Sequence, residues 1–358
     1  MVEQNGIRRN KKEERKYLVF GHIVRGYVST ASPVSSKTIA GMMSGSVSSA
    51  TVRNIMSELE EQGYLEQPHT SAGRIPTDSG YRHYVDMILD RIQMKKEEAK
   101  RLAAEYDLRI RTMKDIIERT SFLLSRELRN AGIVMWPSIG DFYLKHMELI
   151  RVSAETVLAV LITVTNVVKN HLIKLDEDLE KARMERIANY VNKNYGEHVF
   201  SSIPGELKRV LEDSDPEGGS PEDMELARSA LGIMDSIMKE NIENEIYWQG
   251  LNYFMDEPEF RDAGATRNIF RIFSEKDTLV GLMRRDLPHR GLRIHIGGEN
   301  DYEPFKECSI VTCGYTMRDR LAGRIGVIGP RRMDYYNALR TVSCLADLVS
   351  EKLVEIDR

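Results

Sequence analysis

A run of small polar residues followed by an arginine and an asparagine is the chain's clearest chemical signal. Arginine can donate two hydrogen bonds to guanine, and asparagine can form two with adenine, when the side chain reaches the edge of the base. Small neighbours let a helix come close to the groove of a duplex. The candidate contact residues of this run are Ser48, Ser49, Ala50, Thr51, Arg53, Asn54 and Ser57. These residue types indicate contact with double-stranded DNA.

The spacing predicts a helix that presents these side chains on one face. Ser48 is a favourable N-cap residue, and Val47 and Val52 are placed to form a hydrophobic staple across the helix start. Apolar residues recur at helical spacing at Val52, Ile55, Met56 and Leu59. Because that face would be buried, Arg53 and Asn54 would turn toward solvent.

Two helices should precede this one, and a hairpin should follow it. Helical patterns cover residues 12–30 and 36–43, the second capped by Ser35 and facing inward through Ile39 and Met42. Beyond Gly63, two short extended pieces flank a polar tip, as in a β-hairpin. The hairpin residues suited to phosphate or minor-groove contact are His69, Thr70, Ser71 and Arg74. This layout is that of a winged helix-turn-helix, whose third helix enters the major groove.

The charge distribution is compatible with a polyanionic partner at the N-terminal end. The formal net charge of the 358 residues is -4, yet residues 1–57 carry nine basic and three acidic side chains. Lysines and arginines within residues 8–16 could add sequence-independent affinity for phosphates. Charge alone fits a solvated basic tail better than a polyanionic partner. The helical pattern alone fits a small helical domain, with Arg53 and Asn54 merely on its surface, as well as it fits a DNA-binding domain.

The rest of the chain predicts a multidomain α+β protein. A charge-rich helical stretch is expected over residues 90–130, and strands over 145–152, 156–164 and 167–175. Residues 173–263 are mainly helical in pattern and hold 22 acidic and 10 basic residues, and strand patterns return only after them. We therefore expect a DNA-binding domain at 1–89. An α/β domain in two parts, 90–172 and 264–358, should follow, split by an inserted, mainly helical domain at 173–263.

Other chemistry finds little support in the sequence. The 41% hydrophobic and 30% charged residues are typical of globular proteins. No apolar run reaches the roughly 18 residues of a membrane span, and no secretory signal is visible, so a cytoplasmic location is expected. The three cysteines, Cys308, Cys313 and Cys344, fit neither a disulfide framework nor a zinc spacing. We expect no catalytic residue, cofactor or metal.

Three stretches resemble the HrcA family of heat-inducible transcription repressors. The first runs from Ser48 to Leu65, and the second from Pro68 to Thr77 with Gly80-Tyr81-Arg82 after it. The third is Gly326-Val-Ile-Gly-Pro-Arg-Arg-Met-Asp-Tyr335, in which Arg331 stands where threonine is more usual in the family. The likeness extends from end to end of the chain.

The resemblance implies an N-terminal winged helix-turn-helix domain and a GAF-like domain that is split by an inserted dimerisation domain. It also implies a homodimer that represses chaperone operons by binding an inverted-repeat operator called CIRCE, with activity that depends on the GroEL chaperonin. Because GAF-like domains often bind small ligands, a metabolite-responsive winged-helix transcription factor is the alternative. An enzyme with an appended DNA-binding module is a second one, although the C-terminal part shows no reactive centre.

Overall fold

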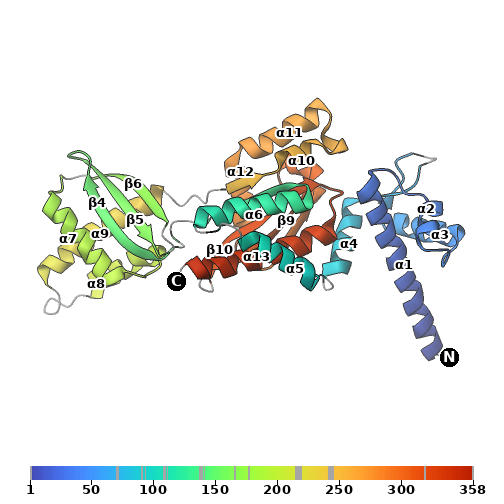
Figure 1. The fold of residues 1–358 in the computed structure, drawn as a ribbon, viewed down its shortest axis with the longest axis horizontal. Coiled ribbons are helices and arrows are strands. Elements are labelled where there is room, and N and C mark those ends of the chain that lie inside the picture. Colours follow the sequence, from blue (N-terminus) through green and yellow to red (C-terminus); the bar gives the residue numbers. More distant parts are fainter. Residues whose placement is uncertain are drawn as a thin grey trace.

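The computed structural model of the chain describes residues 2–69, 72–89, 92, 94–107, 110, 112–136, 140, 142–164, 167–175, 178–213, 220–240, 246–317 and 320–356. Three units follow one another along an elongated molecule (Figure 1). We call residues 2–89 the N-terminal unit, residues 92–136 and 246–356 the central unit, and residues 140–240 the distal unit. The central unit lies between the other two.

The N-terminal unit is a cluster of helices with one small hairpin. Its elements are α1 (Val2–Thr30), α2 (Ser36–Met42), α3 (Ser49–Glu61), β1 (Leu65–Glu66), β2 (Ile75–Pro76) and α4 (Asp78–Leu89). The predicted apolar face of α3 is confirmed, because its four members are all buried. The prediction that Met42 faces inward is wrong. Its side chain is 50% exposed, because α2 ends at this residue on the surface.

The central unit is built on a five-stranded antiparallel sheet with strand order β7-β3-β10-β9-β8. The strands are β3 (Ala131–Met135), β7 (Ile246–Gln249), β8 (Leu292–Ile296), β9 (Cys308–Met317) and β10 (Arg320–Pro330). Alternate residues serve two cores: Val327 packs in the cluster that includes α6 and α13, whereas Ile328 packs in the cluster that includes α11 and α12. Burial on both faces explains why β3 is apolar throughout.

Helices cover both faces of this sheet. They are α5 (Lys96–Asp107), α6 (Met113–Leu128), α10 (Leu251–Met255), α11 (Ala263–Ser274), α12 (Lys276–Asp286) and α13 (Tyr335–Ile356). Short 3₁₀ turns lie at Pro258–Phe260, Gly297–Glu299 and Glu303–Glu307. The helical stretch expected over 90–130 is present, but as two helices, α5 and α6. Of the described helices, none is long and apolar enough to cross a membrane.

The distal unit has a sheet and a core of its own. It contains β4 (Leu144–Arg151), β5 (Thr156–Thr163) and β6 (Val168–Lys174), paired antiparallel in that order, and α7 (Lys181–Tyr195), α8 (Ile203–Asp213) and α9 (Pro221–Glu240), with a 3₁₀ turn at Phe200–Ser202. One face of the sheet packs on the helices. The three strands agree with the predicted ranges to within one residue at each end.

The expected grouping of these strands was wrong. Residues 144–172 were expected to belong with the later strands, but β4, β5 and β6 pair only with one another among the described strands. Conversely, β7 and α10 were expected in the insertion, yet β7 pairs with β3 in the central sheet. A strand pattern reports burial and not the partner strand, so the sequence could not reveal this division.

The chain leaves and re-enters the central sheet at one point, because Met135 at the end of β3 is paired with Ile246 at the start of β7. Paired residues of antiparallel strands lie about 5 Å apart, which a two-residue turn can bridge. Replacing residues 136–245 by Asn-Gly should therefore leave a folded protein with one cooperative thermal transition by circular dichroism. Removing residues 173–263 instead takes away β7, the partner of β3, together with the three helices that cover the distal sheet, and should prevent folding. The reverse result would contradict the division into units.

Candidate nucleic-acid interface

The start of α3 is fixed by hydroxyl groups. Ser48 has extended backbone geometry and its Oγ accepts a hydrogen bond of 3.1 Å from the Thr51 backbone N–H. The Ser48 and Thr51 hydroxyls lie 2.9 Å apart. The Ser49 hydroxyl is 3.0 Å from that of Ser36, which joins the start of α3 to the start of α2. These contacts hold the first turn of α3 in place and leave its end open to solvent.

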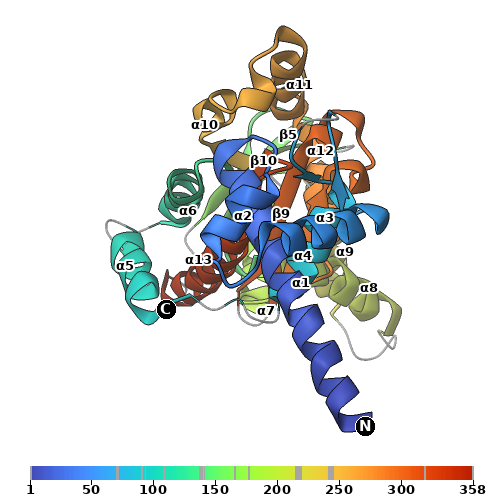
Figure 2. The same cartoon turned by 90° about the vertical axis from the view of Figure 1, so that its right-hand side faces the viewer.

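One face of α3 is exposed and chemically suited to nucleic acid. Ala50, Arg53, Asn54 and Ser57 are exposed, and Ser49 and Thr51 at the helix start are half-buried. Within the part of the chain that the structure describes, the side chains of Arg53 and Asn54 have no hydrogen-bond or ion-pair partner. Figure 2 views the molecule from the end at which α2 and α3 lie. The structure thus brings the predicted α3 residues together on one accessible face.

The hairpin beside α3 has its predicted form. Leu65 pairs with Pro76 and Glu66 with Ile75, and the His69 carbonyl accepts a hydrogen bond of 2.8 Å from the Ala72 N–H at the tip. His69 is exposed. Thr70 and Ser71, the other tip residues predicted to contact DNA, lie outside the described residues. The hairpin therefore presents at least one of its predicted contact residues to solvent.

Arg74, the fourth predicted hairpin residue, is engaged within the protein. Its guanidinium pairs with Glu60 of α3 at 2.8 Å, and only 19% of its side chain is exposed. Its backbone exchanges two hydrogen bonds of 2.9 Å with Val34. At the neighbouring Gly73 a Cβ atom would lie 2.3 Å from the Val34 carbonyl oxygen, so only glycine allows this approach. Arg74 thus anchors the hairpin to α3 and to the segment before α2.

An ion pair also joins α1 to α3. Lys16 is 8% exposed and donates a hydrogen bond of 2.9 Å to Glu58, while the exposed Lys12 lies 3.7 Å from the same carboxylate. The hydrogen bond from Lys16 lowers the pKa of Glu58. Of the basic residues within 8–16, Arg15 is exposed, and the side chains of residues 8–11 lie outside the described part of the chain. Lys16 therefore fixes the packing of α1 on α3.

The start of α2 also belongs to this surface, although the sequence patterns did not assign it there. Ser35 caps α2 by accepting a hydrogen bond of 3.1 Å from the Thr38 N–H, and Lys37 is exposed beside it. The Ser36–Ser49 contact places this helix end next to that of α3. Free N–H groups at two adjacent helix starts favour an anion such as a phosphate. The predicted cap at Ser35 was the available signal.

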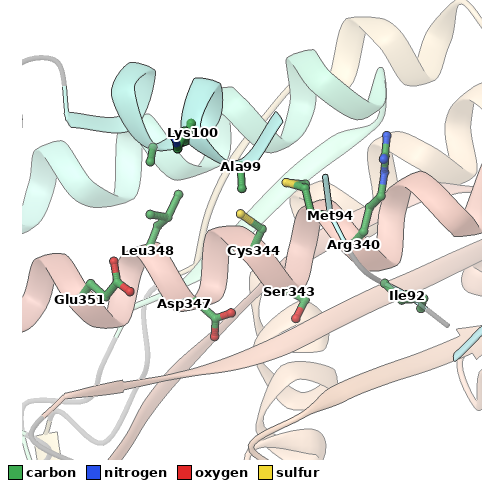
Figure 3. Close-up of a pocket in the computed structure, with 11 residues that line it drawn as sticks. Ile92, Met94, Ala99, Lys100, Arg340, Ser343, Cys344, Asp347, Leu348 and Glu351 are labelled. Atoms are coloured by element: carbon green, nitrogen blue, oxygen red, sulfur yellow. The ribbon is translucent and has the colours of Figure 1, made fainter. Parts of the chain in front are cut away.

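The central unit has a cavity with a mixed apolar and charged lining. A cavity of about 420 Å³ lies between α5 and α13, lined by apolar side chains such as Met94 and Leu348 and by charged ones such as Asp347 (Figure 3). Burial and the nearby Glu351 carboxylate raise the pKa of Asp347. Burial raises the pKa of the Cys344 thiol to about 11, which keeps it protonated and weakly nucleophilic at neutral pH.

The packing role of Lys16 is testable by stability. Lys16→Met removes the ammonium group from Glu58 and should reduce the free energy of unfolding at pH 7 by about 1 kcal/mol, since Glu58 is partly exposed. A carboxylate with a lowered pKa stabilises the fold above its ordinary pKa, and that contribution disappears as the pH falls through the lowered value. The difference should therefore shrink below about pH 4 in urea titrations. Exposed Arg15→Met is the control, and equal effects of both variants would refute the anchor.

Comparisons with known proteins agree over most of the chain. Residues 114–339 match a family model described as "HrcA protein C terminal domain". The chain is 35% identical over 346 residues to the "Heat-inducible transcription repressor HrcA" of Syntrophobacter fumaroxidans, covering 96% of this chain and 97% of the relative. The protein of that name from Geobacter sulfurreducens is 35% identical over 342 residues, covering 95% and 98%.

A solved structure shares the overall fold. A crystal structure described only as that of a hypothetical protein superposes with a TM-score of 0.63 at 23% identity, covering 96% of this chain and 98% of that one. Identity this low supports the fold alone, whereas the full-length relatives support a family. On those relatives and the matching family model, the chain belongs to the HrcA family of heat-inducible transcription repressors.

Proposed function

We propose that the N-terminal unit is a winged helix-turn-helix that binds operator DNA, with α3 in the major groove and the β1–β2 hairpin as the wing. The observation that carries this proposal is the pair Arg53 and Asn54, which are exposed on α3 and without partners in the described part of the chain. The opposite face of α3 is buried and its start is capped. A rigid helix therefore offers two base-reading side chains to a groove.

Each part of this surface has a separate role in the proposal. Arg53 and Asn54 discriminate between bases, while Ala50 and Ser57 permit close approach. The first turns of α3 and α2 hold the phosphate backbone, with Ser48, Ser49 and Thr51 at the α3 start. His69, Thr70 and Ser71 of the wing contact phosphate or the minor groove. Arg74 acts through its ion pair with Glu60, which sets the position of the wing.

Substitutions in α3 test this assignment. Arg53→Ala and Asn54→Ala should each weaken binding to the specific operator by about 1–3 kcal/mol, because each removes a bidentate base contact. Binding to a scrambled duplex should change much less. The control Lys37→Ala should weaken binding to both duplexes and lower the slope of log affinity against log salt by about one. Unchanged operator affinity for both α3 variants, measured by fluorescence anisotropy, would refute the recognition helix.

The proposed operator is an inverted repeat, which requires two copies of the N-terminal unit about a two-fold axis. We place the dimer contact on the distal unit, on the face of its sheet that the helices leave uncovered. Ile150, Val168 and Leu172 are 42%, 55% and 56% exposed there. Single exposed hydrophobic side chains are ordinary, but a group of them on one flat face indicates an interaction site.

The strand register joins these side chains into rows. Leu158 on the central strand lies opposite Ile150 on one side and Leu172 on the other. Ile162 likewise lies between His146 and Val168. A second copy of the same face would cover both rows about a two-fold axis, as an isologous interface does. The contact would leave the N-terminal units free at the far ends of the two elongated molecules.

Charged substitutions on this face test the dimer. Leu172→Arg and Ile150→Arg should convert the protein to a monomer in sedimentation equilibrium, because each would bury an unpaired charge in the interface. Both side chains point away from the core, so the thermal transition of the isolated subunit should persist. Phe270→Arg on α11, where the side chain is 51% exposed, is the matched control and should remain dimeric. Dimers for all three variants would exclude this face.

Family membership supports the remaining proposals. The chain would repress chaperone operons through a CIRCE-type repeat, in the cytoplasm where the chromosome lies, and the GroEL chaperonin would maintain its active form. The central unit would be the GAF-like domain, split by the distal unit. No enzymatic activity is proposed, because the family consists of transcription repressors.

One observation favours a second candidate function. The cavity between α5 and α13 has the size and mixed lining of a small-molecule site, which would suit a metabolite-responsive transcription factor on the same scaffold. Such a factor would change its operator affinity when the metabolite binds. A repressor governed by chaperonin alone would not, so a metabolite that both raises the melting temperature and alters operator binding would favour the second candidate.

A further inference from the structure

The N-terminal unit is attached to the central unit by a group of polar contacts that converge on one face of α4. Asp78 and Arg82 are four residues apart and therefore lie on the same side of this helix. Both side chains reach residues that are more than 200 positions later in the chain. Figure 1 shows α4 between the helices of the N-terminal unit and the central unit. We call Asp78, Arg82, Gly298, Glu299 and Arg331 the clasp.

Arg82 makes the most directional contact of the clasp. Its Nε and one terminal nitrogen donate to the two carboxylate oxygens of Glu299 at 2.8 and 2.5 Å. The same terminal nitrogen donates to the Ile294 carbonyl at 2.8 Å. Glu299 is itself oriented, because it accepts a hydrogen bond of 2.9 Å from the Ile296 N–H. Two-pronged pairing of this kind fixes the relative orientation of its partners as well as their distance.

Asp78 makes the second contact, at the turn that follows β8. Its carboxylate accepts a hydrogen bond of 2.9 Å from the Gly298 N–H and lies 3.4 Å from Arg331, which also pairs with Glu307 at 3.0 Å. Gly297 has a φ of +49°, and a Cβ atom there would lie 2.3 Å from the Asp78 carboxylate. The turn is therefore packed against the aspartate, and its positive φ favours glycine.

A buried apolar contact lies beside the clasp. The rings of Tyr81 and Tyr335 lie 5.5 Å apart and are 2% and 1% exposed. They belong to one apolar cluster that runs from the core of the N-terminal unit to α13. Arg332 makes a third contact between the two units, because it donates a hydrogen bond of 3.0 Å to the Val28 carbonyl of α1. The contact thus combines a buried apolar centre with directional, partly exposed polar pairs at its edge.

We propose that Asp78 and Arg82 are positioning residues that hold the N-terminal unit in one orientation on the central unit, so that a dimer presents its two α3 helices at one separation. The inference rests on the proposed binding of an inverted repeat. If a dimer holds its two α3 helices at a fixed separation, the second half-site adds affinity only when the two half-sites have that same separation. Without the clasp contacts, each N-terminal unit would bind its own half-site in an independent orientation. It would stay attached to the central unit through the segment that links α4 to α5.

The test compares operator spacing with half-site affinity in the full-length protein. For wild type, inserting 5 base pairs between the half-sites rotates one by about half a turn and should weaken binding by roughly 100-fold. For the double variant Asp78→Asn/Arg82→Gln the same insertion should weaken binding by less than about tenfold, with weaker binding at the natural spacing. Affinity for a duplex with a single half-site should stay within about twofold of wild type, because α3 is untouched.

Controls separate the clasp from general stability and from the operator itself. Arg186→Gln breaks an ion pair with Glu222 inside the distal unit and should keep the wild-type spacing profile. The charge exchange Arg82→Glu/Glu299→Arg should restore spacing discrimination relative to Arg82→Glu alone. A double variant with the wild-type profile, or one that loses half-site binding, would overturn the inference. If wild type itself does not distinguish the repeat from a scrambled duplex, the proposed function fails instead.

Discussion

The burial of one face of α3 is the constraint on which the rest of the N-terminal unit depends. Val52, Ile55 and Leu59 are each 7% exposed or less, so the helix has one rotational setting against its neighbours. That setting turns Arg53 and Asn54 outward and leaves them without partners among the described residues. Ion pairs then fix the surroundings: Glu58 of α3 holds α1 through Lys16, and Glu60 of α3 holds the hairpin through Arg74. Glu58 and Glu60 of α3 thus fix the positions of Lys16 and Arg74.

The sheets of the central and distal units differ in how they are covered. The central sheet is buried on both faces and supports the N-terminal unit through α4 and α13. The distal sheet is buried on one face only, and its other face carries apolar side chains in register. A sheet buried on both faces can hold the N-terminal unit in a fixed position. A sheet with one uncovered apolar face can form an interface with another molecule. This division supports the proposal that the N-terminal unit contacts DNA, the central unit holds it, and the distal unit forms the dimer contact.

Local sequence patterns predicted the elements well, and contacts between distant residues account for what they missed. The Ser48 cap and the buried face of α3 depend on residues within a few turns, so periodicity was sufficient. The ion pairs of Lys16 and Arg74 join residues 42 and 14 positions apart, and no local rule reveals them. Lys16, expected near DNA because of its charge, and Arg74, expected there because of its place in the hairpin, are both paired within the protein. Pairing of β7 with β3 across the whole insertion was hidden for the same reason.

The distance along the chain also concealed the role of the late signature. Arg331 lies far from the α3 sequence, yet in the structure it contacts Asp78 at the start of the helix that follows the hairpin. Composition and periodicity describe each stretch by itself. Only the folded chain shows that the late signature and the start of α4 are in contact. The resemblance to the family covered both stretches but gave no reason for their common presence.

The central claim is that this chain reads an inverted-repeat operator under chaperonin control. The most direct measurement is a binding titration of the full-length protein on duplex carrying the chaperone-operon repeat, against a scrambled duplex of equal length and salt, with and without GroEL. We predict at least about 1,000-fold preference for the repeat, with a larger active fraction when the chaperonin is present. Equal, salt-sensitive binding to both duplexes would contradict the claim, because the phosphate backbone alone would then explain the affinity.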